Sequence, residues 1–305
     1  MTRIDTRVSA EGRSRTGSLF VVLAAVGFST KAILVKLAYV HQVDAVTLLA
    51  IRMAFSLPFF ALMALLGRSN SGNGTISPAD WAAVLGLGLL GYYVASFLDF
   101  RGLEYVSAGL ERLVLFLYPT LVVLLSSVFL GRRIKSKEVG ALILSYLGIA
   151  LVFYRQASFE QENFMLGAGL VFGSTVAYAI YLMGSSRVIA RFGPTRFTAY
   201  AMTAACAGCM AQFAATHPLS ALRVSSDVYA LSLGMAIFST VLPSLFLSLG
   251  IRRIGATRAS LISSIGPVVT IALAYVFLGE VMSGEQWLGS CLVMAGVLIV
   301  SLGKN

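Results

Sequence analysis

The sequence predicts an all-α polytopic membrane protein with about ten transmembrane helices, arranged as two inverted five-helix repeats. Three observations predict this fold: an apolar composition, hydrophobic stretches of membrane-spanning length, and an internal repeat. Hydrophobic residues make up 58% of the 305 residues and charged residues only 12%, with a mean hydropathy of +0.86. A soluble domain carries about 25% charged residues. The composition therefore excludes a soluble globular protein.

The helices are placed by length, because a span needs about 20 mostly apolar residues. We expect helices near 18–40, 44–66, 79–99, 104–130, 137–154, 165–190, 195–215, 228–250, 256–278 and 285–302. Residues 1–17 are polar and basic, and the apolar run that follows is long enough to span. We therefore expect a cytoplasmic tail rather than a cleaved signal peptide. The two repeats would then cover 18–154 and 165–302.

The charge distribution orients these helices. The formal net charge is +10. With the N-terminus inside, sixteen basic residues fall on the cytoplasmic side and three, Arg101, Arg155 and Arg223, on the outer side. Short cytoplasmic loops carry an excess of Lys and Arg. We therefore expect both termini in the cytoplasm, at a bacterial inner membrane, and this topology explains the basic excess without a nucleic-acid partner.

An internal repeat appears when the chain is shifted by 148 residues, which aligns 103–153 with 251–301. The aligned segments share a Val-Phe-Leu-Gly block, several glycines and a proline, Pro119 or Pro267. Five helices per repeat is an odd number, so the second copy enters the membrane from the opposite side. This inverted arrangement is typical of secondary transporters, which bind substrate near the midplane between the repeats.

The paired prolines predict irregular helices. Proline removes a backbone hydrogen bond and clashes with the preceding turn, so we expect kinks near 115–119 and 263–267. Pro119 and Pro267 are then either static kinks or symmetric hinges that serve gating.

Three motifs resemble the EamA domain. The first is GFSTKAILVK at 27–36, followed by Arg52, and the other two lie in 102–132 and 254–280, each with a small-residue helix and a central proline. On these motifs the chain is identified as a ten-helix member of the drug/metabolite transporter superfamily. The first copy departs from the pattern, because Arg132 stands where the closing glutamate, Glu280 in the second copy, is usual.

The resemblance implies a secondary transporter of small organic metabolites. Within the superfamily the chain is most similar to bacterial amino-acid exporters, including the aromatic amino-acid branch. We expect export of amino acids by alternating access through a central cavity between the repeats. A passive metabolite facilitator and a membrane scaffold subunit that transports nothing are the alternatives, although a scaffold has no need of two inverted halves.

Ionisable side chains inside a membrane are costly and usually serve an ion pair or the transport path. One interpretation is a structural ion-pair cluster of Lys36 and Arg52 with Glu111 and Asp99. The other is that these groups meet a substrate carboxylate or carry a coupling proton, and Lys31 is the best placed for this because its depth prevents easy snorkelling. The ionisable residues that the prediction places inside the membrane are Lys31, Lys36, Arg52, Glu111 and Arg112, with Asp99, Arg101 and Glu104 near a helix end.

Polar and aromatic side chains form stripes along four predicted helices. Such stripes mark either helix–helix contacts, where Ser and Thr bond across the interface, or the lining of a cavity. The predicted substrate cavity comprises Lys31, Tyr92, Ser96, Glu111, Tyr118, Tyr178, Tyr181, Ser263 and Ser264.

Signatures of enzymes and metal sites are not found in the sequence. It contains no HExxH, GxSxG or P-loop motif, and Cys206 and Cys209 lie within an apolar run, where packing is the better interpretation. We therefore expect no enzymatic activity, no cofactor and no metal. The expected partners are a small-molecule substrate and the lipid bilayer, and a monomer is sufficient for this function.

Overall fold

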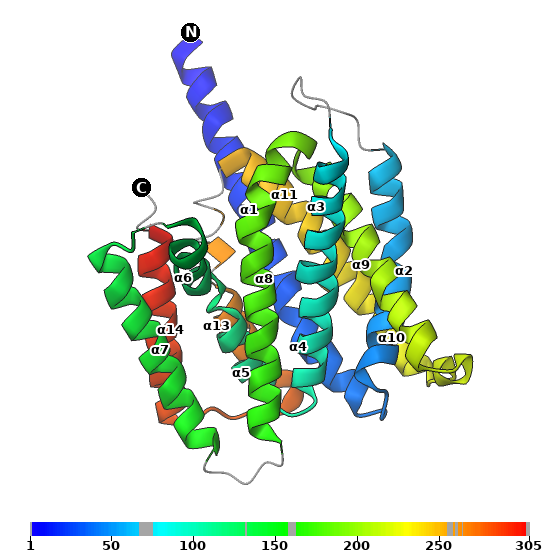
Figure 1. The fold of residues 1–305 in the computed structure, drawn as a ribbon. Helices are drawn as coiled ribbons and strands as arrows, with labels where there is room; N and C mark the ends of the chain where they lie inside the picture. Colours follow the sequence, from blue (N-terminus) through cyan, green and yellow to red (C-terminus); the bar gives the residue numbers. More distant parts are fainter. Residues whose placement is uncertain are drawn as a thin grey trace.

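The computed structural model describes residues 2–66, 76–131, 133–157, 163–254, 259, 262–263 and 265–302. These residues form helices and connecting turns, with no strand among them. The helices make one bundle, and both termini lie toward the same end of it (Figure 1). Six helical stretches of the described chain are long and apolar enough to cross a membrane, and two further apolar helices are shorter. The protein is an all-α polytopic membrane protein, as predicted.

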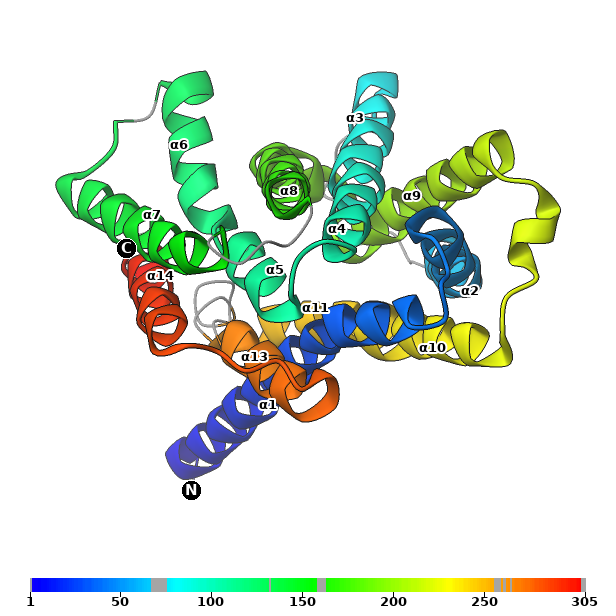
Figure 2. The ribbon, with the colours of Figure 1, turned by 90° about the horizontal axis from the view of Figure 1, so that it is seen from below.

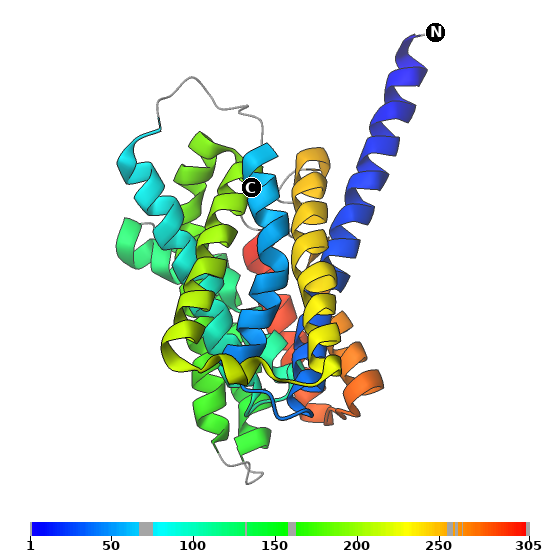
Figure 3. The same cartoon turned by 90° about the vertical axis from the view of Figure 1, so that its right-hand side faces the viewer.

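The first repeat runs from α1 to α7. Its elements are α1 (Thr2–Tyr39), α2 (Ala45–Leu66), α3 (Pro78–Gly88), the π-helix η1 (Leu89–Val94), α4 (Ala95–Leu103), α5 (Ala108–Leu115), α6 (Tyr118–Leu130) and α7 (Ser136–Ala157). One boundary differs from the prediction: α1 begins at Thr2, so the expected tail continues the first helix. No proline interrupts this segment to end the helix, and its N-terminal part projects beyond the bundle (Figure 3).

The second repeat runs from α8 to α14. Its elements are α8 (Phe164–Phe192), α9 (Pro194–Thr216), the 3₁₀ turn η2 (Leu219–Leu222), α10 (Ser226–Ala236), the π-helix η3 (Ile237–Val241), α11 (Leu242–Ile254), α13 (Gly266–Leu278) and α14 (Gly284–Leu302). The ten predicted spans correspond to these helices, several of which are divided into two or three parts.

The fourth helix of the first repeat is divided at the position where the sequence predicts a kink. It consists of α5 and α6, which are separated by Phe116 and Leu117. Pro119 lies in the first turn of α6, where a residue without an N–H costs little. In the second repeat, α13 begins at Gly266 with Pro267 in its first turn. The breaks therefore follow from the prolines, whereas a hinge function stays a prediction.

A second pair of irregularities lies at equivalent places in the two repeats. The π-helix η1 begins at residue 89, and adding the repeat shift of 148 gives 237, the first residue of η3. π-Helical turns are rare and frequently mark functional sites. They bring Tyr92 and Thr240, which are equivalent under the same shift, to the interior of the bundle.

The packing of the helices follows the repeat. On one side of the bundle, seen along the helices, α7 packs on α14, and on the opposite side α2 packs on α9 (Figure 2). Between these pairs, α1 packs on α11 and α13, while α8 packs on α4, α5 and α6. The first helix of each repeat therefore contacts both repeats, and it carries its polar side chains into the interface between them.

Candidate functional site

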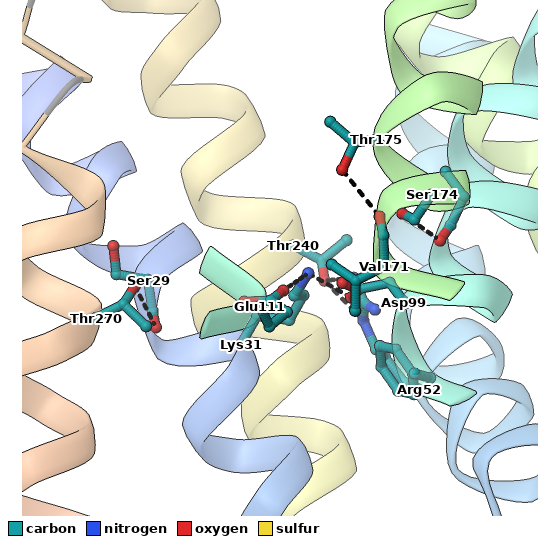
Figure 4. Close-up of polar contacts among 12 residues, drawn as sticks. Ser29, Lys31, Arg52, Asp99, Glu111, Val171, Ser174, Thr175, Thr240 and Thr270 are labelled. Atoms are coloured by element: carbon teal, nitrogen blue, oxygen red, sulfur yellow. Dashed lines mark hydrogen bonds and ion pairs between the residues drawn. The ribbon is translucent and has the colours of Figure 1, made fainter. Parts of the chain in front are cut away.

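Lys31 lies at the centre of a buried ion-pair cluster formed by three helices of the first repeat (Figure 4). Its Nζ donates a hydrogen bond to Oδ2 of Asp99 on α4 at 2.6 Å and lies 2.9 Å from Oε1 of Glu111 on α5. The Asp99 and Glu111 side chains are only 2% and 0% exposed. Removing one partner from such a buried pair costs about 3–5 kcal/mol. The cluster therefore fixes α1, α4 and α5 to one another.

The two carboxylates differ in how they contact Lys31. Asp99 accepts the hydrogen bond from Lys31, whereas Glu111 makes an ion pair with it that lacks hydrogen-bond geometry, and Oε2 of Glu111 has no partner among the described residues. Glu111 lies in the first turn of α5, whose N-terminus is capped by Ser107. A negative charge is favoured at that end of a helix. Within the described part of the chain, both carboxylate oxygens of Glu111 lack a hydrogen bond, whereas in Asp99 only Oδ1 does, so Glu111 has the larger free bonding capacity.

Arg52 and Lys36 have partners different from those expected. Arg52 donates hydrogen bonds to Oγ1 of Thr240 from Nε at 3.1 Å and from Nη2 at 2.9 Å, and its guanidinium lies 5.3 Å from the centre of the Phe100 ring. Lys36 lies within electrostatic range of Glu280. Lys36 follows Lys31 by five positions, a step that turns a helix by about 140° beyond a full rotation. Only one of the two lysines can face the acids, and it is Lys31.

Four tyrosines of the predicted cavity set form one aromatic cluster. The ring centre of Tyr178 lies 5.4 Å from that of Tyr118 and 5.6 Å from that of Tyr181. Tyr92 meets Tyr181 edge to face at 4.9 Å, and their hydroxyl groups are 2.9 Å apart. The Tyr181 ring contacts Gly91 of η1 so closely that a Cβ there would collide with it. The sequence stripe on α8 therefore faces the first repeat.

The serines of the prediction are placed differently from one another. Ser96 is half-buried on α4, Ser263 is half-buried, and Ser264 lies outside the described residues. Ser174, from the same stripe as the tyrosines, donates a hydrogen bond to the Ala95 carbonyl at 2.7 Å (Figure 4). That contact is the helix-packing role that the sequence also allowed for such stripes.

Several residues that join the two repeats were not among the site residues predicted from the sequence. Ser29 on α1 donates a hydrogen bond to the Gly266 carbonyl at 3.0 Å, and Thr270 on α13 donates to the Ser29 carbonyl at 3.4 Å (Figure 4). Thr240, the partner of Arg52, was also missed. Its equivalence to Tyr92 under the repeat shift is the signal that could have found it.

The closing glutamate of the second repeat contacts the first repeat directly. Glu280 follows α13, and its carboxylate accepts hydrogen bonds from the backbone N–H of Ala108 at 2.9 Å and of Gly109 at 3.2 Å. These groups form the first turn of α5, whose backbone donors lack partners within the helix. Glu280 therefore caps a helix of the other repeat.

A hollow at the surface of the bundle lies away from these residues. It has a volume of about 380 Å³ and is lined by Leu37, Val40, His41, Asp227, Ala230 and Leu231. None of the predicted cavity residues lines it, so a central cavity stays a prediction. No cluster of three or more potential metal ligands occurs among the residues that the structure describes.

Similarity to known proteins agrees with this architecture. The chain is 32% identical over 296 residues to YcbK, an uncharacterized transporter of Bacillus subtilis, covering 95% of this chain and 92% of the relative. A probable terminal-alkyne amino-acid exporter of Streptantibioticus cattleyicolor is 25% identical over 205 residues, covering 66% of each chain. A crystal structure with 19% sequence identity has the same fold, with a TM-score of 0.63 over 94% of this chain and 97% of that one.

The sequence profile of the EamA-like transporter family matches two segments, 15–154 and 165–302. The two matches coincide with the two sets of helices described above, and together they cover nearly the whole chain. This protein belongs to the EamA-like transporter family.

Proposed function

We propose that this protein exports small organic metabolites, amino acids foremost, by alternating access between its two repeats. In this proposal 18–154 and 165–302 are the units that move, both termini face the cytoplasm, and the membrane is the plasma membrane of a bacterium. The substrate class is supported by the Streptantibioticus cattleyicolor relative, which is named as a probable amino-acid exporter.

The observation that carries the proposal is the buried cluster of Lys31, Asp99 and Glu111. Two carboxylates share one ammonium group, so this cluster has a place for one proton. Ionisable groups at such depth serve proton or substrate pathways by default. We assign the proton to Glu111, because both of its carboxylate oxygens lack a hydrogen bond to the described residues whereas Asp99 accepts one from Lys31, and infer that an entering proton drives the substrate outward.

Contacts between the repeats support alternating access. Arg52 with Thr240, Ser29 with Gly266 and Glu280 with the start of α5 each join the two repeats. Polar contacts of this kind can break and form again as one repeat rocks against the other around a central site.

The test is transport into proteoliposomes. Labelled amino acids should accumulate when the pH gradient has the sign that drives export in the cell, and accumulation should vanish when an ionophore dissipates the gradient. Equal entry with and without the gradient would show a passive facilitator. A protein that moves no tested metabolite under either condition would contradict the proposal.

A further inference from the structure

Arg112 is a cation inside the bundle that the ion-pair cluster does not use. It follows Glu111 on α5 and is half-buried. Its Nε is shielded from solvent and has no hydrogen-bond partner, and within the described part of the chain no carboxylate forms an ion pair with it. A charge in the membrane is costly unless polar or oppositely charged groups satisfy it. The free bonding capacity of this guanidinium indicates a ligand.

The guanidinium lies against the backbone of the other repeat. A Cβ on Gly266, the first residue of α13, would come within 2.6 Å of Nη2 of Arg112 and within 3.4 Å and 3.5 Å of its Cζ and Nε. Any side chain at Gly266 would therefore displace the arginine. Arg112 belongs to the first repeat but contacts the second, at the surface where inverted-repeat transporters bind their substrates.

Two helices begin near Arg112: α6 starts shortly after it in the chain, and α13 starts at Gly266, the residue that its guanidinium contacts. Neither α6, which begins at Tyr118, nor α13, which begins at Gly266, has a side-chain cap at its N-terminus. The N-terminus of a helix carries a partial positive charge, and in transporters such half-helix ends point at anionic groups of the substrate. The N-termini of the two helices and the arginine all carry positive charge, so they all favour a negatively charged ligand.

The charges of the region leave one positive charge unbalanced. Four cations, Lys31, Lys36, Arg52 and Arg112, stand against the three carboxylates of Asp99, Glu111 and Glu280, which gives a sum of +1 when all are ionised. Lys31 is paired with Asp99 and Glu111, and Lys36 lies within electrostatic range of Glu280. Arg52 is occupied by Thr240 and Phe100. The positive charge available to a ligand is therefore that of Arg112.

We propose that Arg112 binds the carboxylate of the transported substrate. A guanidinium can bind a carboxylate through two parallel hydrogen bonds, which gives both strength and orientation. Tyr118 and Tyr178 lie within electrostatic range of Arg112, and these two rings are assigned to the rest of the bound molecule. This inference rests on the proposed export of amino acids and adds the group that recognises them.

The experiment compares each amino acid with its amide, in which the carboxylate is replaced by a neutral group. Binding to the purified protein is measured from the shift of its melting temperature on titration. Wild-type protein should bind the acids at least tenfold more tightly than the amides. Arg112→Gln should bring this ratio close to one, and Arg112→Lys should give an intermediate value. Arg101→Gln, the same change at a more exposed arginine paired with Glu104, should keep the wild-type ratio.

A second variant tests the geometry without changing the charge. Gly266→Ala should displace the guanidinium and lower the acid-to-amide ratio, and it answers the question even if Arg112→Gln does not fold. Folded Arg112 and Gly266 variants that keep the wild-type ratio would overturn the assignment while leaving amino-acid export intact. So would wild-type protein that binds amides as tightly as acids. Wild-type protein that binds neither would contradict the proposed substrate class as well.

Discussion

Lys31 shows how a single residue defines the charged site. From the sequence, two lysines of the first helix, Lys31 and Lys36, compete for the role of partner to Asp99 and Glu111. The structure selects Lys31, with the carboxylates at 2.6 and 2.9 Å. The depth of each residue could be read from the helix length, but the rotation of α1 about its axis depends on its packing against α11 and α13. That rotation decides which lysine meets the acids.

Glu111→Gln separates a structural role of this cluster from a coupling role. The amide keeps the size of the side chain but cannot carry a proton, and Lys31 keeps its hydrogen bond to Asp99. We expect folded protein with a modestly lowered melting temperature, normal exchange of substrate between equal pools, and no accumulation driven by a pH gradient. Glu104→Gln, at a partly exposed pair with Arg101, is the control. If the Glu111 variant still accumulates substrate under a gradient, Glu111 does not carry the proton.

Tyr178 tests the aromatic cluster. An aromatic contact contributes about 0.5–1.5 kcal/mol beyond the area it buries, and about 1.4 kcal/mol is a tenfold change in affinity. Tyr178→Ala should therefore weaken substrate binding by up to about tenfold. Tyr275→Ala is a matched control, because Tyr275 is 63% exposed on α13. Equal affinities of the two variants would show that the substrate does not contact the cluster.

At the scale of helices, the sequence predicts breaks better than it predicts π-turns. The break between α5 and α6 follows from Pro119, because proline lacks the N–H that a continuous helix needs. The π-helices η1 and η3 contain no residue with such a requirement, and they arise from tertiary packing, as in the close contact of Gly91 with Tyr181. The position of Tyr92 could therefore be predicted only approximately.

Glu280 offers a prediction at this scale. Its carboxylate caps α5 from the other repeat, so losing the charge should loosen the contact between α5 and the end of α13. Loss of an N-terminal cap costs about 0.5–2 kcal/mol. In Glu280→Gln, a cysteine at Gly109, whose Cβ would lie 3.7 Å from Glu280 Oε2, should react faster with a thiol reagent than in the parent protein.

The background for this measurement carries Cys291→Ser, because Cys291 is exposed while Cys206 and Cys209 are buried. Glu104→Gln in the same background should leave the rate of labelling unchanged. A rate that is equal in the Glu280 variant and its parent would contradict a role for this cap in holding α5 against the end of α13.

At the scale of the whole molecule, composition, span length and the repeat were sufficient to predict the fold. An apolar chain must place its helices in lipid, and an odd number of helices per repeat makes the second copy inverted. The candidate site stays a prediction as a set of residues, and its contacts could not be predicted. Arg52 with Thr240 and Glu280 with Ala108 join residues far apart in the chain, and a single sequence carries no distance information between them.

Inversion itself can be tested with two pairs of introduced cysteines at equivalent places in the repeats. His41 lies between α1 and α2, and Thr195 lies in the first turn of α9, directly after the connection from α8. Ser136 and Ser283 lie at the start of the last helix of each repeat. Because the repeats enter from opposite sides, the members of a pair should label from opposite sides. An impermeant thiol reagent added to intact cells that carry Cys291→Ser should reach His41→Cys and Ser283→Cys. Thr195→Cys and Ser136→Cys should react only after the cells are opened. Labelling of both members of a pair from one side would contradict the inverted arrangement, whereas a complete exchange of the pattern would keep it and place both termini outside.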